Sequence, residues 1–133
     1  MSGATHSGLI DALADPASAG PLEILDDGIR FRSPFADYAG RDDVTHLLGL
    51  VSEVLTEVRP VRRLSAGTTT MTLFDARVAD EAVQGVLCEE RGDECRVIDA
   101  MLTVRPYVGL RVAMRAMGAL MEASPLPSAR SDG

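Results

Sequence analysis

The stretch from Phe31 to Asp43 places the strongest constraint on what this chain can fold into. Its sequence, FRSPFADYAGRDD, starts as the end of a hydrophobic strand, reaches a corner at Pro34 and continues into a helix with an acidic first turn. Pro34 interrupts a strand because it has no backbone N–H to donate. Asp42 and Asp43 suit a helix start, because negative charge is stabilised near the N-terminus of a helix. The stretch therefore predicts a strand, a corner and a helix in that order.

The chain as a whole has the size and composition of one compact domain. It has 133 residues, of which 46% are hydrophobic, and a formal net charge of −7. An acidic chain has no basic footprint for nucleic acid or an anionic membrane, so we expect neither as a partner. Two cysteines are too few for a secreted disulfide framework, and no apolar run near the N-terminus has the length of a signal or membrane-spanning segment. These features predict a cytoplasmic protein.

Metal and cofactor sites have no recognisable pattern in the sequence. The chain has two histidines and two cysteines, and none of them forms a CxxC or HxxxH pair. Zinc sites need such closely spaced ligands, so we predict no metal and no cofactor.

Hydrophobic periodicity predicts an α+β order of elements. The expected elements are a helix at 7–15, short strands at 22–25 and 28–31 around the turn Asp26-Asp27-Gly28, a helix at 42–58 that ends before Pro60, strands at 62–79, 82–90 and 95–105, and a helix at 107–123. Leu110, Met114, Met117 and Met121 form one apolar stripe on the last helix. The tail from Ser124 to Gly133 is rich in Ser and Pro and is predicted to be disordered.

Strand alternation assigns side chains to two faces of the expected sheet. A two-residue turn at 80–81 would pair Val78 with Val83, and a four-residue turn at 91–94 would pair Leu87 with Ile98. Paired residues share a face. One face, almost wholly apolar, then holds Thr72, Phe74, Ala76, Val78, Val83, Gly85, Leu87, Ile98, Ala100, Leu102 and Val104. The other face is mixed and holds Met71, Leu73, Asp75, Arg77, Gln84, Val86, Cys88, Val97, Asp99, Met101 and Thr103.

A second corner, Val104-Arg105-Pro106, closes the last expected strand. Together with the stretch Phe31 to Asp43, it resembles the nuclear transport factor 2-like superfamily, which includes SnoaL-type polyketide cyclases and ketosteroid isomerases. The resemblance covers about residues 22–106. It implies a single domain with a cone-shaped, curved antiparallel sheet packed against helices, as in cystatin-like folds, and a conical cavity on the apolar side of the sheet.

The catalytic residues of a ketosteroid isomerase are not recognisable in this chain. In those enzymes the base is an Asp directly before the proline of the corner, and that position resembles Ser33 here. A serine hydroxyl without an adjacent base is a poor proton acceptor. The oxyanion donors, a Tyr on the first helix and an Asp on a central strand, also have no clear counterparts, because the matching strand reads Gly85-Val86-Leu87.

Three polar residues remain near the expected cavity mouth, namely Asp37, Tyr38 and His46. In a catalytic interpretation Tyr38 would donate a hydrogen bond to a ligand carbonyl while Asp37 or His46 exchanges a proton. In a structural interpretation, which we favour, Asp37 caps the corner, Tyr38 packs with a bonded hydroxyl and His46 lies at the helix boundary.

A second catalytic hypothesis involves Asp75, Arg77 and Asp99. These residues resemble the Asp-Arg-Asp set with which limonene-epoxide-hydrolase-like members of the superfamily activate water. In the register above all three lie on the mixed face, where they would form an ion-pair network. A shift of one residue would instead turn them into the cavity.

The sequence favours a ligand-binding domain over an enzyme, because the apolar face carries hardly any ionisable group. The expected ligand is a small hydrophobic molecule, contacted by Ser33, Tyr38, Phe74, Leu87 and Leu102. The alternative is a cyclase, isomerase or epoxide-hydrolase type of enzyme acting by acid/base chemistry. The apolar residues of the mixed face predict a homodimer, because a monomer would leave them exposed to water.

Overall fold

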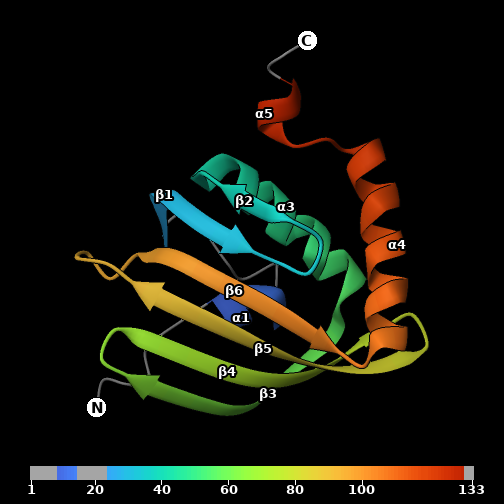
Figure 1. Cartoon of the computed structure of the whole chain (residues 1–133), viewed down its shortest axis with the longest axis horizontal. Coiled ribbons are helices and arrows are strands. Elements are labelled where there is room, and N and C mark those ends of the chain that lie inside the picture. Colours follow the sequence, from blue (N-terminus) through green and yellow to red (C-terminus); the bar gives the residue numbers. More distant parts are fainter. Residues whose placement is uncertain (1–8, 15–23, 131–133) are drawn as a thin grey trace.

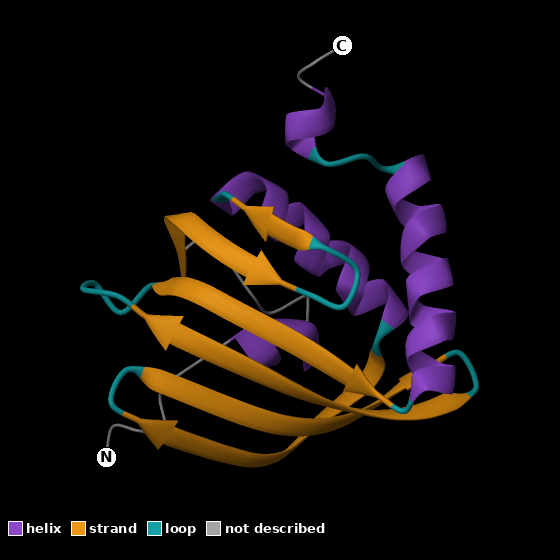
Figure 2. Cartoon of the chain, in the orientation of Figure 1, coloured by secondary structure: helices purple, strands orange, loops and turns teal. Residues whose placement is uncertain are grey.

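Six strands form one curved sheet, and the helices lie on one side of it (Figure 1, Figure 2). This computed structural model describes residues 9–14 and 24–130. The elements are α1 (Leu9–Ala14), β1 (Leu25–Arg32), β2 (Asp37–Ala39), α3 (Arg41–Val54), β3 (Thr56–Ala66), β4 (Thr69–Val78), β5 (Glu81–Arg91), β6 (Val97–Arg105), α4 (Tyr107–Ala123) and α5 (Pro127–Arg130). The predicted α+β class is confirmed, with a sheet that curves but does not close.

The sheet has the strand order β2-β1-β6-β5-β4-β3 and is mixed rather than wholly antiparallel, because β1 runs parallel to β6. The two short strands expected around Asp26-Asp27-Gly28 are not a hairpin, since these residues lie inside β1. The Gly28 N–H donates to Asp26 Oδ2 at 3.0 Å, and the pairing with β6 shifts between Leu25 and Arg30. The local turn signal therefore produces an irregularity within one strand.

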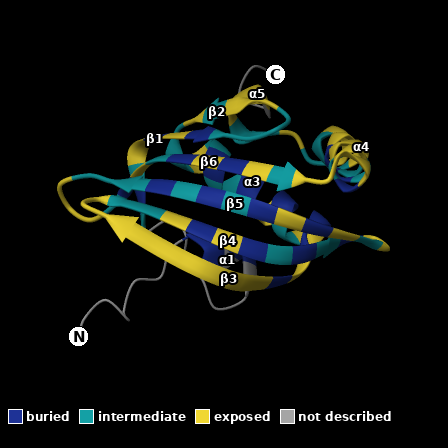
Figure 3. Ribbon diagram, turned by 60° about the horizontal axis from the view of Figure 1, so that its bottom comes forward, coloured by how far each residue is buried: buried dark blue, intermediate teal, exposed yellow. Residues whose placement is uncertain are grey.

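The two faces of β4, β5 and β6 are assigned correctly by the alternation, although the predicted pairs are wrong. Phe74 lies opposite Gly85, and Leu87 lies opposite Leu102. The pairing partner shifts by two residues at the first turn, where Val78 lies opposite Glu81, and by four at the second. Because both shifts are even, side chains stay on their predicted faces. The exception is at Val97 and Ile98, where an irregularity near Arg91 buries Val97 and leaves Ile98 37% exposed. Figure 3 shows the alternation along these strands. We call the helix-covered side the inner face and the opposite side the outer face.

The helix predicted to reach Val58 ends four residues earlier, at Val54. From Thr56 the chain forms β3, an edge strand that contains Pro60 and is exposed over most of its length. Proline is tolerated there because an edge strand has one row of N–H groups without a ladder partner. The strand predicted at 62–79 is divided at Gly67, which has a φ of 60° in the hairpin between β3 and β4.

The inner face is covered by α1, α3 and α4. Leu9, Ile10 and Leu13 of α1 are buried, so this short helix packs into the core with α3 and β3. Gly109, Ala113 and Met117 are the buried residues of α4, whereas Met114, part of the predicted apolar stripe, is 42% exposed. The other three residues of the stripe face the core, since Met117 is buried and Leu110 and Met121 are partly buried. The closest approach of α4 to the sheet is made by Gly109. A Cβ atom at Gly109 would lie 2.2 Å from Val83 Cγ1.

The tail predicted to be disordered from Ser124 is folded as far as Arg130. It contains the single-turn helix α5, which packs against α3. A Ser- and Pro-rich composition did not prevent this, because α3 supplies hydrogen-bond partners for the segment.

The close approach of α4 to β5 predicts opposite effects for two glycine-to-alanine substitutions in the same helix. Gly118→Ala should stabilise the protein by about 1 kcal/mol, because alanine is the better helix former and the added Cβ would meet no atom beyond its own stretch of helix within 4 Å. Gly109→Ala should destabilise it by about 1–3 kcal/mol, because the added Cβ overlaps Val83. Urea unfolding measures both. Equal effects of the two substitutions would contradict the packing described here.

Candidate ligand site beneath helix α4

A small apolar space lies between α4, the end of α3, the β1–β2 corner and β6. Its volume is about 10 Å³. The lining residues are Pro34, Phe35, Val51, Val54, Leu55, Leu102, Val104, Leu110, Ala113 and Met117. None of these side chains is polar or ionisable, so the space can contact a ligand only through apolar surface.

The proline corner that borders this space is held by Ser33. The Ser33 hydroxyl donates to the carbonyl of Ala36 at 2.9 Å and accepts the N–H of Phe35 at 3.1 Å. The Ser33 N–H also donates to the Ala36 carbonyl, at 3.0 Å. Ser33 therefore closes a tight turn that places Phe35 against the core, in place of the ligand contact expected from the sequence.

Of the five predicted ligand contacts, Leu102 alone lines the space beneath α4. Phe74 and Leu87 are fully buried core residues of the inner face. Tyr38 packs against the core from β2. The missed lining residues come mainly from α3 and α4. The apolar spacing of both helices could have indicated these residues. Such spacing predicts which side of a helix is buried, but it does not predict which other element that side packs against.

The polar residues predicted at the cavity mouth do not converge on this space. Asp37 is exposed at the start of β2. Burial raises the pKa of the Tyr38 hydroxyl above its ordinary value, so this group stays neutral at physiological pH. His46 lies on α3, where Nε2 is 2.8 Å from the carbonyl oxygen of Ser124. The capping role expected of Asp37 and the bonded hydroxyl expected of Tyr38 stay predictions, whereas His46 contacts the segment after α4.

One carboxylate does lie on the inner face, and the sequence analysis missed it. Glu89 is 2% exposed and accepts a hydrogen bond from the Leu9 N–H at 3.0 Å. Its Oε1 is 3.9 Å from Arg91 Nη2. The alternation along β5 predicts this position if it is continued two residues beyond Leu87. Glu89 fastens α1 to the sheet and does not line the space beneath α4.

The Asp75, Arg77 and Asp99 set lies on the outer face and is not brought together. Arg77 donates to the carbonyl of Asp80 at 3.0 Å, and Asp99 pairs with Arg32 at 3.0 Å. Across the sheet, Asp75 of β4 lies opposite Gln84 of β5, and Gln84 lies opposite Arg105 of β6. Asp99 is therefore six residues along β6 from the residue that is level with Asp75. A water held jointly by the two carboxylates is incompatible with this separation.

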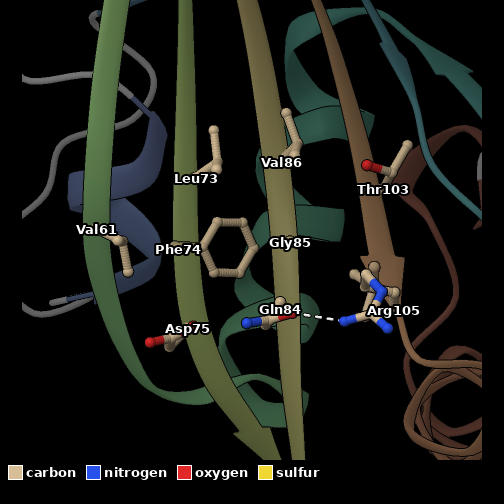
Figure 4. Close-up of a pocket in the computed structure, with 10 residues that line it drawn as sticks. Val61, Leu73, Phe74, Asp75, Gln84, Gly85, Val86, Thr103 and Arg105 are labelled. Carbon is tan, nitrogen blue, oxygen red and sulfur yellow. Dashed lines mark hydrogen bonds between the residues drawn. The ribbon is translucent and has the colours of Figure 1, made fainter.

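The outer face has a hollow of about 280 Å³. Figure 4 shows Val61, Leu73, Val86 and Thr103 around it, with Gln84 accepting a hydrogen bond from Arg105 at its lower end. The hollow is open to solvent and is separated from the inner face by the sheet itself. Within the described residues, no three His, Cys, Asp or Glu side chains are grouped so that they could hold a metal ion.

Comparison with solved structures identifies the fold family. An uncharacterised protein with a cystatin-like fold from Silicibacter pomeroyi matches with a TM-score of 0.82 and 24% identity, over 87% of this chain and 84% of that one. A steroid delta-isomerase from Pseudomonas aeruginosa matches with a TM-score of 0.78 and 30% identity, over 87% of this chain and 85% of that one. The chain belongs to the nuclear transport factor 2-like superfamily.

An NTF2-like protein of unknown function from Mesorhizobium loti, 20% identical, also matches with a TM-score of 0.62 over 73% of this chain and 84% of that one. No protein-family model matches the sequence, and no curated protein matches it significantly. The solved-structure matches confirm membership of the NTF2-like superfamily, which the two proline corners predicted. The described part of the chain contains no helix that is long and apolar enough to cross a membrane.

Proposed function

We propose that this NTF2-like protein binds a small, uncharged hydrophobic molecule beneath α4. The observation that carries the proposal is the wholly apolar lining of the space between α3, α4 and the sheet. A polar group buried there without a partner would cost several kcal/mol, on the order of 2–7. The site therefore selects for apolar surface.

Binding requires α4 to move outward, because a space of about 10 Å³ holds one water molecule at most. The helix is suited to such a movement. Among its described residues only Gly109, Ala113 and Met117 are fully buried, and Tyr107, Val108 and Met114 are exposed. Met117 is flexible enough to line an apolar pocket of variable shape. The ligand would then replace contacts that α4 makes in the closed form.

The site lacks the groups that acid/base catalysis needs. A general base must lie within hydrogen-bond reach of the proton that it removes. Ser33 is committed to its turn, Tyr38 has a raised pKa, and Glu89 accepts the N–H of Leu9. These contacts favour a binding protein over an enzyme of the cyclase, isomerase or epoxide-hydrolase type.

Ligand binding can be tested with N-phenyl-1-naphthylamine, an uncharged probe that fluoresces in apolar surroundings. Met117→Ala enlarges the space beneath α4 and should increase the affinity for the probe severalfold, with a loss of stability of about 2–5 kcal/mol. Met101→Ala is the matched control, because Met101 lies 39% exposed on the outer face. It should leave the affinity unchanged. The proposal is contradicted if Met101→Ala weakens binding while Met117→Ala has no effect.

The reaction named for the Pseudomonas relative gives a second test. We expect no conversion of a β,γ-unsaturated ketosteroid to its conjugated isomer above the uncatalysed rate. A positioned base and an oxyanion donor each contribute about 100-fold or more, and neither faces the space beneath α4. Absorbance of the conjugated product measures the reaction. Turnover that Tyr38→Phe abolishes, in a variant with unchanged circular dichroism, would overturn the expectation.

We also propose that two copies of the chain associate through their outer faces. Leu64, Met71, Leu73 and Met101 are 57%, 41%, 39% and 39% exposed there, and no described helix covers this side (Figure 1). The hollow beside Leu73 offers a place for a protruding side chain of a second copy. Two charged groups that border the patch are paired, Arg32 Nη2 with Asp99 and Arg105 with Gln84, which lowers the cost of covering these atoms.

Light scattering of the purified chain should give about twice the monomer mass of 14.1 kDa. Met101→Arg should shift the mass toward the monomer, because an interface would bury the new charge without a partner. Met114→Arg is the control, since Met114 is similarly exposed but lies on α4. A monomeric wild-type protein at high concentration, or equal effects of both substitutions, would refute the dimer.

A further inference from the structure

Two side chains of α3 hold the segment that follows α4. Asp43 accepts two hydrogen bonds from Ser128, one from the backbone N–H at 3.0 Å and one from the hydroxyl at 2.6 Å. One turn further along α3, His46 Nε2 lies 2.8 Å from the Ser124 carbonyl oxygen and 3.1 Å from the Ser124 hydroxyl. Because Nε2 faces a carbonyl oxygen, it carries the hydrogen and donates it. We call these four contacts the clasp.

The clasp is located just beyond the C-terminal end of α4, next to Leu120 and Met121, which pack against the core. At its N-terminal end α4 continues directly from β6 through Pro106, and Gly109 packs closely against Val83. Its C-terminal end is followed by Ser124 and then by α5, which lies next to α3 at the far end of α4 from the sheet (Figure 1). A movement of α4 away from the inner face would be smallest at Pro106 and would separate Ser124 from His46.

We propose that the clasp keeps α4 closed over the apolar space and thereby sets how readily a ligand enters. This inference rests on the proposed function for its biological meaning, because it identifies what regulates access to that site. The closed form has room for no ligand, so only molecules with α4 displaced can bind one. The apparent dissociation constant is then the intrinsic one divided by the open fraction. Weakening the clasp should therefore tighten binding.

Asp43→Ala is the decisive substitution, because it removes both contacts to Ser128. The chain offers a closely matched control in Asp42→Ala. Both aspartates lie in the first turn of α3, so both substitutions remove one negative charge from the favourable end of the helix dipole. Asp42 is exposed, and it makes no hydrogen bond to the described residues 124–130. We expect Asp43→Ala to raise the affinity for N-phenyl-1-naphthylamine about fivefold to tenfold over Asp42→Ala, the effect of losing about one net hydrogen bond.

A second measurement follows the opening of α4 without any ligand. Ala113 lies on the buried side of α4 and is 2% exposed, so a cysteine placed there should react slowly with a thiol reagent. The natural Cys88 and Cys95 are first replaced by alanine, since both have accessible surface. In this background Ala113→Cys should be labelled about fivefold to tenfold faster with Asp43→Ala than with Asp42→Ala. His46→Ala should act in the same direction, because it releases Ser124.

The two measurements separate the clasp from the ligand site. Faster labelling together with tighter probe binding supports both. Faster labelling without any probe binding supports the clasp and refutes the proposed ligand. Equal labelling rates in Asp43→Ala and Asp42→Ala would overturn the clasp, whatever the probe does. Circular dichroism and urea unfolding of each variant establish that the compared proteins are folded.

Discussion

The alternation of apolar side chains along β4, β5 and β6 is the constraint on which the rest of this structure depends. It turns Phe74, Val83, Leu87 and Leu102 to one side of the sheet, where each is at most 2% exposed. An apolar sheet face of this kind must be covered by another layer, and here the helices supply that layer. The positions of α1, α3 and α4 follow from this requirement.

The same alternation explains why the sheet faces could be predicted while its registers could not. Within a strand the face depends only on whether a residue number is odd or even, and the pairing errors at both turns are even, so the predicted faces are preserved. Val97 and Ile98 are the exception, because the irregularity near Arg91 exchanges them. Local signals failed where tertiary contacts override them. Asp26-Asp27-Gly28 has the composition of a turn but lies inside β1, and Pro60 lies inside an edge strand. The segment after Ser124 has a disordered composition but finds partners on α3.

The candidate site was less predictable than the fold. Its lining combines a proline corner, the end of α3, β6 and α4, and periodicity within one element does not show which elements meet. In α4 the periodicity of the large methionines defined the predicted buried stripe. The closest contact with the sheet, however, is made by Gly109 against Val83, and a residue without a side chain adds nothing to an apolar pattern. Glu89 was missing from the predicted inner face because the alternation along β5 was applied only as far as Leu87.

The absence of polar groups from the lining separates the two functional classes considered for this chain. An acid/base enzyme needs an ionisable group at the reacting atom, whereas a binding site for an apolar molecule needs a cavity of sufficient volume and an entry path for the ligand. In the proposed binding mode, movement of α4 would create the volume and the clasp on α3 would oppose that movement. Glu89, the buried carboxylate of the inner face, accepts a hydrogen bond from the Leu9 N–H of α1 and does not line the space beneath α4.

The central claim is that an apolar ligand enters beneath α4 and not on the outer face. Methyl NMR of the methionines tests this most directly, because Met117 lines the inner space and Met101 lies on the outer face. On addition of N-phenyl-1-naphthylamine, we predict intermolecular nuclear Overhauser effects from the probe to the Met117 methyl group and none to that of Met101. Contacts to Met101 alone would contradict the account.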